Sequence, residues 1–143
     1  MESELATTNV NRSYSLGGTS IAIFTFVLFF LYPMVARSEV NALLFQATLV
    51  VMGVATFSFV FSSLYYYGSS LGGARVDDAV RARYSRRGDR FWLLGYTLLF
   101  LGPSLVLFAV GLLVVGSAWL ALWLVYVFFV TRFFPRVQTT PQS

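Results

Sequence analysis

The segment that decides the fold is "FWLLGYTLLFLGPSLVLFAVGLLVVGSAWLALWLVYVFFVT", Phe91–Thr131, in which 41 consecutive residues carry no formal charge. A membrane-spanning helix needs roughly 20 mostly apolar residues. A single helix of the whole segment would extend about 60 Å, at 1.5 Å per residue. The segment is therefore too long for one span, and it fits two spans joined by a tight turn.

Two more uncharged segments precede it, residues 13–36 and residues 40–74, and each is long enough for one span. Only 11% of the 143 residues are charged, against about 25% in soluble domains. Unpaired strands are costly in lipid, and these long runs lack the alternation of a membrane barrel. The sequence predicts an all-α integral membrane protein with four transmembrane helices.

The predicted division of the chain follows from these runs and from the charged residues between them. We expect a mobile polar leader and a polar tail, with Pro135 stopping the fourth span. The predicted parts are a leader at 1–16, spans at about 17–35, 41–67, 91–110 and 114–134, an arginine-rich loop at 68–90, and a tail at 135–143.

The arginines predict the orientation in the membrane. All ten basic residues are arginine, and six of them lie in the loop 68–90, one in the leader and two at the end of the chain. Cytoplasmic loops carry an excess of arginine and lysine. We therefore expect the leader, this loop and the tail on the cytoplasmic side of a cell inner membrane. The absence of lysine is typical of a GC-rich prokaryotic genome.

The composition excludes most catalytic chemistry. The chain has no cysteine and no histidine, which excludes disulfides, thiolate chemistry and Cys/His zinc sites. Apart from Arg132 near the end of the fourth span, no Asp, Glu, Lys, Arg or His lies inside a predicted span, which argues against a proton relay or a voltage sensor. Asp77 and Asp78 precede Arg81 by four and three residues, the spacings at which opposite charges pair along a helix. We expect no enzymatic activity, no metal and no cofactor.

Small and polar residues predict how the spans contact one another, because helices in lipid associate through such residues. The second span has them on two nearly opposite sides, so we expect it to be the central helix. One side would be internal packing, or would line a pore or a subunit interface. The two stripes are Gln46, Gly53, Thr56, Ser63 and Tyr67 on one side, and Thr48, Ala55, Ser58 and Ser62 on the other.

The other spans carry shorter patterns of the same kind. In the third span, Gly95, Gly102 and Ala109 recur every seven residues, which predicts a close-packing seam. Pro103 beside it predicts a kink. The remaining small-residue positions are Gly18, Ala22 and Thr25 in the first span, and Ser117 and Ala121 in the fourth.

The loop from Arg75 to Arg90 predicts an anion-binding surface. Val76, Val80 and Tyr84 recur every four residues, as in a short interfacial helix lying on the inner leaflet. Arginines there would contact anionic lipid headgroups. Alternatively they would bind a phosphate-bearing cytoplasmic ligand, with Tyr84 stacked on a base. The candidate residues are Arg81, Arg83, Tyr84, Arg86, Arg87 and Arg90.

Arg87-Gly88-Asp89 matches an adhesion tripeptide, but it falls on the predicted cytoplasmic side, so we discard that interpretation. Two functional hypotheses remain open. The first is a self-associating four-helix inner-membrane protein that acts as an ion-conducting or membrane-permeabilising channel, influenced at its arginine-rich loop. The alternative is a non-catalytic accessory subunit of a larger membrane complex.

Overall fold

The computed structural model describes residues 2–70 and 77–137, and the side chains of residues 7–69 and 77–132. These ranges contain four helices, and each is long enough and apolar enough to cross a membrane. The prediction of an all-helical protein with four helices long enough and apolar enough to span a membrane is thereby confirmed. The helices are α1 (Glu2–Ala36), α2 (Ala42–Ser70), α3 (Asp78–Ala109) and α4 (Leu113–Val137).

The helices extend beyond the predicted spans at one end of the molecule. Residues 2–16, predicted as a mobile leader, are the first turns of α1. Pro135 does not stop α4, which continues to Val137. Hydropathy indicates where a helix meets lipid, whereas the helical hydrogen bonds continue into the polar residues on either side. The tail residues 138–143 lie outside the described residues.

The arginine-rich segment also differs from the prediction. The residues from Asp78 onward are the first turns of α3, which runs without a break to Ala109. No separate interfacial helix is present among these described residues, because α3 continues through Gly88 into the apolar segment. Residues 71–76, which include Arg75 and Val76, lie outside the described residues.

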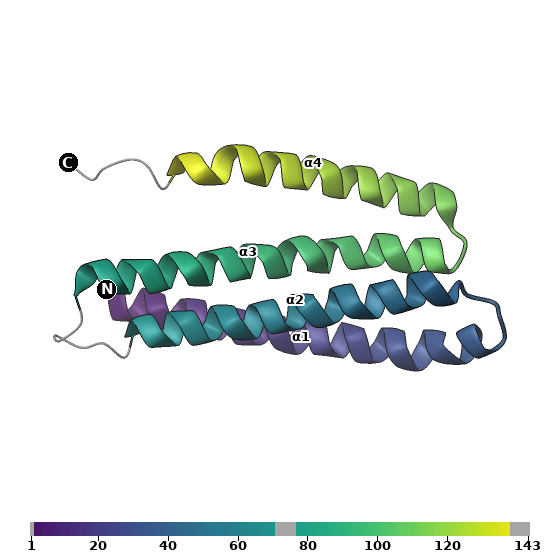
Figure 1. Cartoon of the computed structure of the whole chain (residues 1–143), viewed down its shortest axis with the longest axis horizontal. Coiled ribbons are helices and arrows are strands. Elements are labelled where there is room, and N and C mark those ends of the chain that lie inside the picture. Colours follow the sequence, from purple (N-terminus) through teal and green to yellow (C-terminus); the bar gives the residue numbers. More distant parts are fainter. Residues whose placement is uncertain (1, 71–76, 138–143) are drawn as a thin grey trace.

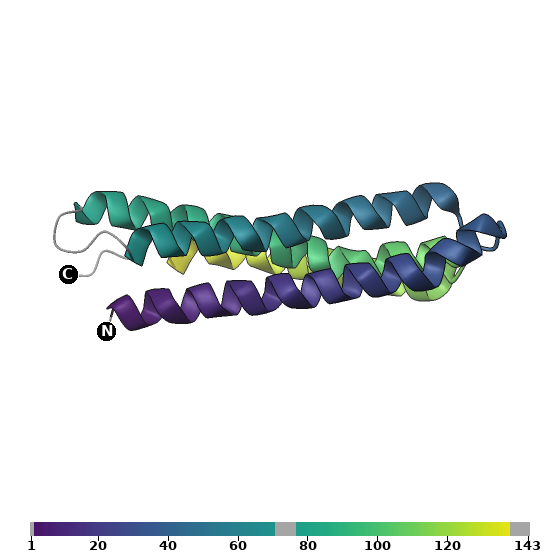
Figure 2. The same ribbon diagram turned by 90° about the horizontal axis from the view of Figure 1, so that it is seen from below.

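The four helices run alternately up and down (Figure 1), so α1 and α3 begin at the end of the molecule where α2 and α4 finish. Helix α2 packs against both α1 and α3, which confirms its predicted central position, and α4 packs principally against α3. Figure 2 shows α1 and α2 running side by side along the length of the molecule. The result is a core of three helices with α4 added at the side of α3.

The contact between α2 and α3 repeats every seven residues. The small residues of α3 predicted as a seam do lie against α2, and the repeat extends one step further, to Gly88. Each small residue lies beside a large buried side chain of α2, with Met52 at 2% and Phe59 at 0% exposure. In chain order along α3, the facing residues are Gly88 with Tyr66, Gly95 with Phe59, Gly102 with Met52, and Ala109 in the same apolar cluster as Phe45.

Hydroxyl groups connect α1 to α2. The Ser62 hydroxyl donates to the Gly88 carbonyl oxygen at 2.9 Å. Because a serine hydroxyl has one proton, the 3.3 Å contact between Ser13 and Ser62 has Ser13 as its donor. The same argument applies to Ser20, 2.8 Å from a Thr56 hydroxyl that itself donates to a backbone carbonyl. These chains leave each buried hydroxyl with a partner, which lipid could not provide.

At the other end of the molecule, two helices end in the same way. Gly111 after α3 and Ser38 after α1 both have positive φ, 83° and 60°. In each turn, two backbone N–H groups bond back to carbonyls of the last helical turn, the pattern of a Schellman cap. The Asn41 N–H donates to the Ala109 carbonyl at 3.0 Å, which joins the two turns.

Polar bonds and one close steric contact, that of Gly116 with the Phe108 ring, hold α4 on α3. The Trp119 and Trp123 indole N–H groups donate to carbonyls of α3, those of Phe100 at 3.1 Å and Thr97 at 2.8 Å. The Ser104 hydroxyl donates to the Gly116 carbonyl at 3.0 Å. Gly116 is the only buried residue of α4 among those whose side chains are described. Helix α4 therefore leaves most of its surface exposed.

We predict that Gly95→Ala destabilises the protein, because the added Cβ would lie 2.8 Å from Cε1 of the fully buried Phe59 ring. Overpacking of this kind costs about 1–3 kcal/mol. The measurement is thermal unfolding of the purified protein in detergent. Gly53→Ala is the matched control, since a Cβ at Gly53 meets nothing within 4 Å.

The double variant Gly95→Ala with Phe59→Leu should recover part of the lost stability, because the smaller side chain removes the clash. Equal melting temperatures for Gly95→Ala and Gly53→Ala would contradict the proposed contact between α2 and α3.

Candidate functional site

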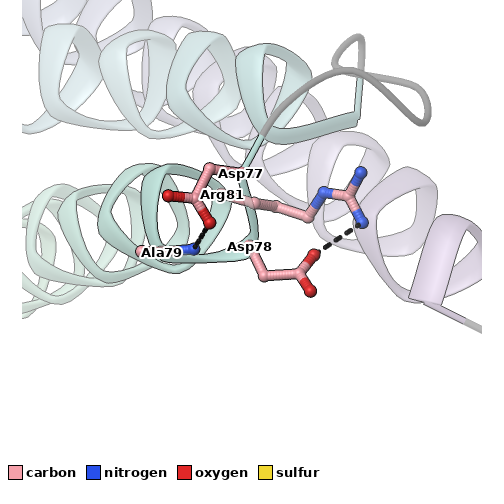
Figure 3. Close-up of polar contacts among 4 residues, drawn as sticks. All are labelled: Asp77, Asp78, Ala79 and Arg81. Atoms are coloured by element: carbon pink, nitrogen blue, oxygen red, sulfur yellow. Dashed lines mark hydrogen bonds and ion pairs between the residues drawn. The ribbon is translucent and has the colours of Figure 1, made fainter.

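The arginine-bearing surface is built on the first turns of α3. Asp77 is the N-cap, and its carboxylate accepts from the Ala79 N–H at 3.2 Å. Asp78 lies in the first turn, where a negative charge is favourable to the helix dipole, and its carboxylate is 3.9 Å from Arg81. Figure 3 shows both carboxylates gathered around the start of the helix. These contacts begin the helix before the arginines, so the arginines have fixed helical positions.

Gly88 and Asp89 determine which side of this part of α3 faces α2. A Cβ on Gly88 would lie 2.9 Å from the Tyr66 ring, so Gly88 faces α2 at close range. The Tyr66 hydroxyl donates to the Asp89 carboxylate at 2.5 Å. The glycine and the aspartate of the Arg-Gly-Asp tripeptide are thus both engaged in packing α3 against α2.

Four arginines share the side of α3 that faces away from α2. At 100° per residue they fall within an arc of about 100°, centred roughly 150° from Gly88. All four side chains are exposed. None of them makes an ion pair with a described residue, and the Arg86 Nε donates to the Ala82 carbonyl. We call this set the arginine stripe: Arg83, Arg86, Arg87 and Arg90.

The structure separates the other two predicted anion-binding residues from this stripe. Arg81 is half-buried and is paired with Asp78. Tyr84 packs toward α2, with its ring 5.9 Å from the Tyr65 ring and 3.3 Å from the Cβ position of Gly68. Of the six predicted residues, four therefore form one surface, and the tyrosine expected to stack on a base lies outside it.

The predicted pore or packing residues of α2 lie in different surroundings. Gln46 is exposed and Gly53 is half-buried. Thr56 bonds to Ser20 of α1 and to the backbone of its own helix. Ser63 is fully buried and donates to a carbonyl of its own helix at 2.7 Å. The second predicted stripe, from Thr48 to Ser62, is buried throughout. Pro103 lies within α3 with its ring exposed.

The small face predicted for the first span does not contact α2. Helix α1 turns Ser13, Gly17 and Ser20 toward the core instead. The prediction of intramolecular packing is wrong for the opposite face, which is exposed along three helical turns. A Cβ on Gly18 would meet nothing within 4 Å. We call this exposed set the α1 small face: Ser15, Gly18, Ala22 and Thr25.

Comparison of the chain with protein-family models, with curated proteins and with solved structures found no match. In the part of the chain that the structure describes, no group of three or more His, Cys, Asp or Glu side chains lies together as a metal site would need.

The contacts that sequence reasoning missed are those of Gly88, Asp89 and Tyr66. One signal was available, because Gly88 lies seven residues before Gly95 and continues its repeat. The residues around Gly88 are charged and therefore predict a loop, so the repeat of small residues was not extended to Gly88. A matching repeat exists on α2, where Tyr66 follows Phe59 and Met52 at intervals of seven residues, but the three consecutive tyrosines at residues 65–67 obscure it.

We predict that Tyr66→Phe lowers the free energy of unfolding by about 1.5–3 kcal/mol, the usual worth of a hydrogen bond to a charged group. The double variant Tyr66→Phe with Asp89→Ala should be less destabilised than the sum of the two single variants, because both remove the same bond. Unfolding in detergent, followed by circular dichroism, measures all three.

Tyr32→Phe is the control for this cycle, since Tyr32 is 62% exposed on α1. Strict additivity of the two single changes would show that the bond between Tyr66 and Asp89 contributes nothing to stability.

Proposed function

We propose that this chain is a non-catalytic protein of a prokaryotic inner membrane that associates with copies of itself. Both termini and the arginine stripe lie on the cytoplasmic side, in accordance with the excess of arginine at that end. Self-association provides the functional unit, and the contact between copies is made by the α1 small face.

The observation that carries this proposal is the exposure of the α1 small face. Helix α1 has small and hydroxyl-bearing residues on two sides, and only the side with Ser13 and Ser20 is covered by α2. In lipid, small side chains favour helix association because they let two backbones approach closely. The exposed side, with Gly18 at its centre, is thus suited to a second helix.

The same contacts bear on the channel hypothesis. Thr56 and Ser63, two residues considered for a pore, have their hydroxyl groups engaged within the chain. We therefore propose that ion conduction takes place along the interface between copies, not through the four helices of one copy. A channel of this kind would depend on the α1 small face for its assembly.

An accessory role remains the second candidate function, since the exposed surface of α4 supports it. Apart from Gly116, the residues of α4 with described side chains are exposed or half-buried, while α1, α2 and α3 form the core. A helix held at the side of a core in this way can contact a larger membrane protein. In that case the chain would co-purify from its native membrane with one stoichiometric partner.

We predict that the purified protein is a defined oligomer in mild detergent, and that Gly18→Leu with Ala22→Leu converts it to a monomer. The two leucines would separate the backbones of neighbouring α1 helices. The measurement is the protein mass from light scattering with detergent subtracted, followed by conductance of planar bilayers containing each variant.

Ala118→Leu with Ala121→Leu is the control, because it also adds two leucines, at exposed positions of α4. A monomeric wild-type protein would overturn the proposal of self-association. A single stoichiometric partner from native membrane, without a homo-oligomer, would establish the accessory role in its place.

A further inference from the structure

We infer that the arginine stripe of α3 is a binding site for the headgroup phosphate of an anionic phospholipid. The inference concerns a surface of one copy, so it holds whether or not copies associate. It rests on the geometry of the four arginines, on the contacts that hold the neighbouring carboxylates away from them, and on the apolar surface of α3 that follows the stripe toward the membrane interior.

The spacing of the arginines suits bidentate recognition of phosphate. Arg83 and Arg87 are four residues apart, and so are Arg86 and Arg90. Side chains four residues apart on a helix have their Cβ atoms about 5–6 Å from each other. Two guanidinium forks at that spacing can converge on one phosphate, with two parallel N–H···O bonds from each fork. The stripe thus contains two such pairs.

The acids of this segment do not neutralise the stripe. Asp77 caps α3, Asp78 pairs with Arg81, and Asp89 accepts from Tyr66. Each carboxylate is held by a contact off the stripe. No described carboxylate therefore compensates the charge of the four arginines, and an anion in the headgroup layer would balance it.

The depth of the stripe matches a lipid headgroup. Arg90 directly precedes the uncharged segment Phe91–Thr131. From Arg83 to Arg90 the helix rises about 10 Å, which covers the headgroup layer of about 5–8 Å on each side of a bilayer. Arginine side chains also reach along an apolar surface toward the headgroups.

The surface next to the stripe favours a lipid over a soluble anion. Leu94 lies one turn beyond Arg90 on the same side of α3 and is 43% exposed. An acyl chain attached to a bound phosphate can lie against it. A nucleotide would need a platform for its base, and Tyr84 packs toward α2 instead. Phosphate recognition is common to both ligands, but only the lipid uses the apolar neighbour.

The test is native mass spectrometry of the full-length protein in detergent, titrated with short-chain phosphatidylglycerol, phosphatidylcholine or inorganic phosphate. We expect the wild-type protein to retain phosphatidylglycerol in preference to phosphatidylcholine. Removing one arginine near a membrane surface should weaken binding about fivefold. Arg86→Gln with Arg90→Gln should therefore raise the dissociation constant for phosphatidylglycerol about 25-fold.

The control pair is Arg12→Gln with Arg37→Gln. These changes remove the same net charge from two exposed arginines outside the stripe. We expect the control pair to change the dissociation constant by less than about twofold, since bidentate contacts are local. Equal weakening by the two pairs would overturn the site, because it would show a general charge effect.

A second variant keeps the test valid if loss of arginines disturbs membrane insertion. Arg86→Lys with Arg90→Lys preserves the charge but loses the planar fork, so we expect weaker binding at unchanged insertion. Wild-type affinity in this variant would overturn the bidentate site. Displacement of phosphatidylglycerol by equimolar inorganic phosphate would show that the ligand is a soluble phosphate, and would overturn the assignment to lipid.

Discussion

The seven-residue match between α2 and α3 is the constraint on which the rest of the structure depends. Apolar side chains gain nothing by leaving lipid for one another, so helices in a membrane associate where their backbones come close. Three glycines of α3 allow this approach, and large side chains of α2 occupy the space. If α3 were shifted by one residue along α2, the large side chains of α2 would meet side chains of α3 instead of glycines. The steric fit therefore fixes the register of α3 against α2.

That register also positions the polar groups at the arginine-bearing end. It brings the Gly88 carbonyl to the Ser62 hydroxyl, and the Asp89 carboxylate to the Tyr66 hydroxyl. Since Gly88 must face α2, the four arginines around it must face away from α2. One short segment thus has two roles that do not interfere: its glycine and aspartate determine packing, and its arginines determine the charge of the surface.

The number of spans and the seam of α3 were predictable, because both depend on local features of the sequence. Uncharged length indicates a span, and the recurrence of Gly95 and Gly102 indicates a close contact. Helix ends were not predictable in this way, since residues 2–16 and 78–90 are polar but helical. The side of α1 that faces α2 was not predictable either. Two small faces on α1 look alike in sequence, and only the position of α2 decides that Ser13 is buried and Gly18 exposed.

Helix α3 therefore connects two kinds of packing. Its glycine side is held to α2 by the fit of large side chains against glycines, with hydrogen bonds from Ser62 and Tyr66 at one end. Its other side is held to α4 by indole and hydroxyl donors on backbone carbonyls, and by the close contact of Gly116 with Phe108. Hydrogen bonds between membrane helices contribute only about 0.6–2 kcal/mol each. Positions Arg83, Arg90, Thr97 and Ser104 follow one another every seven residues on this second side. The arginine stripe is thus the continuation, along α3, of the side that contacts α4.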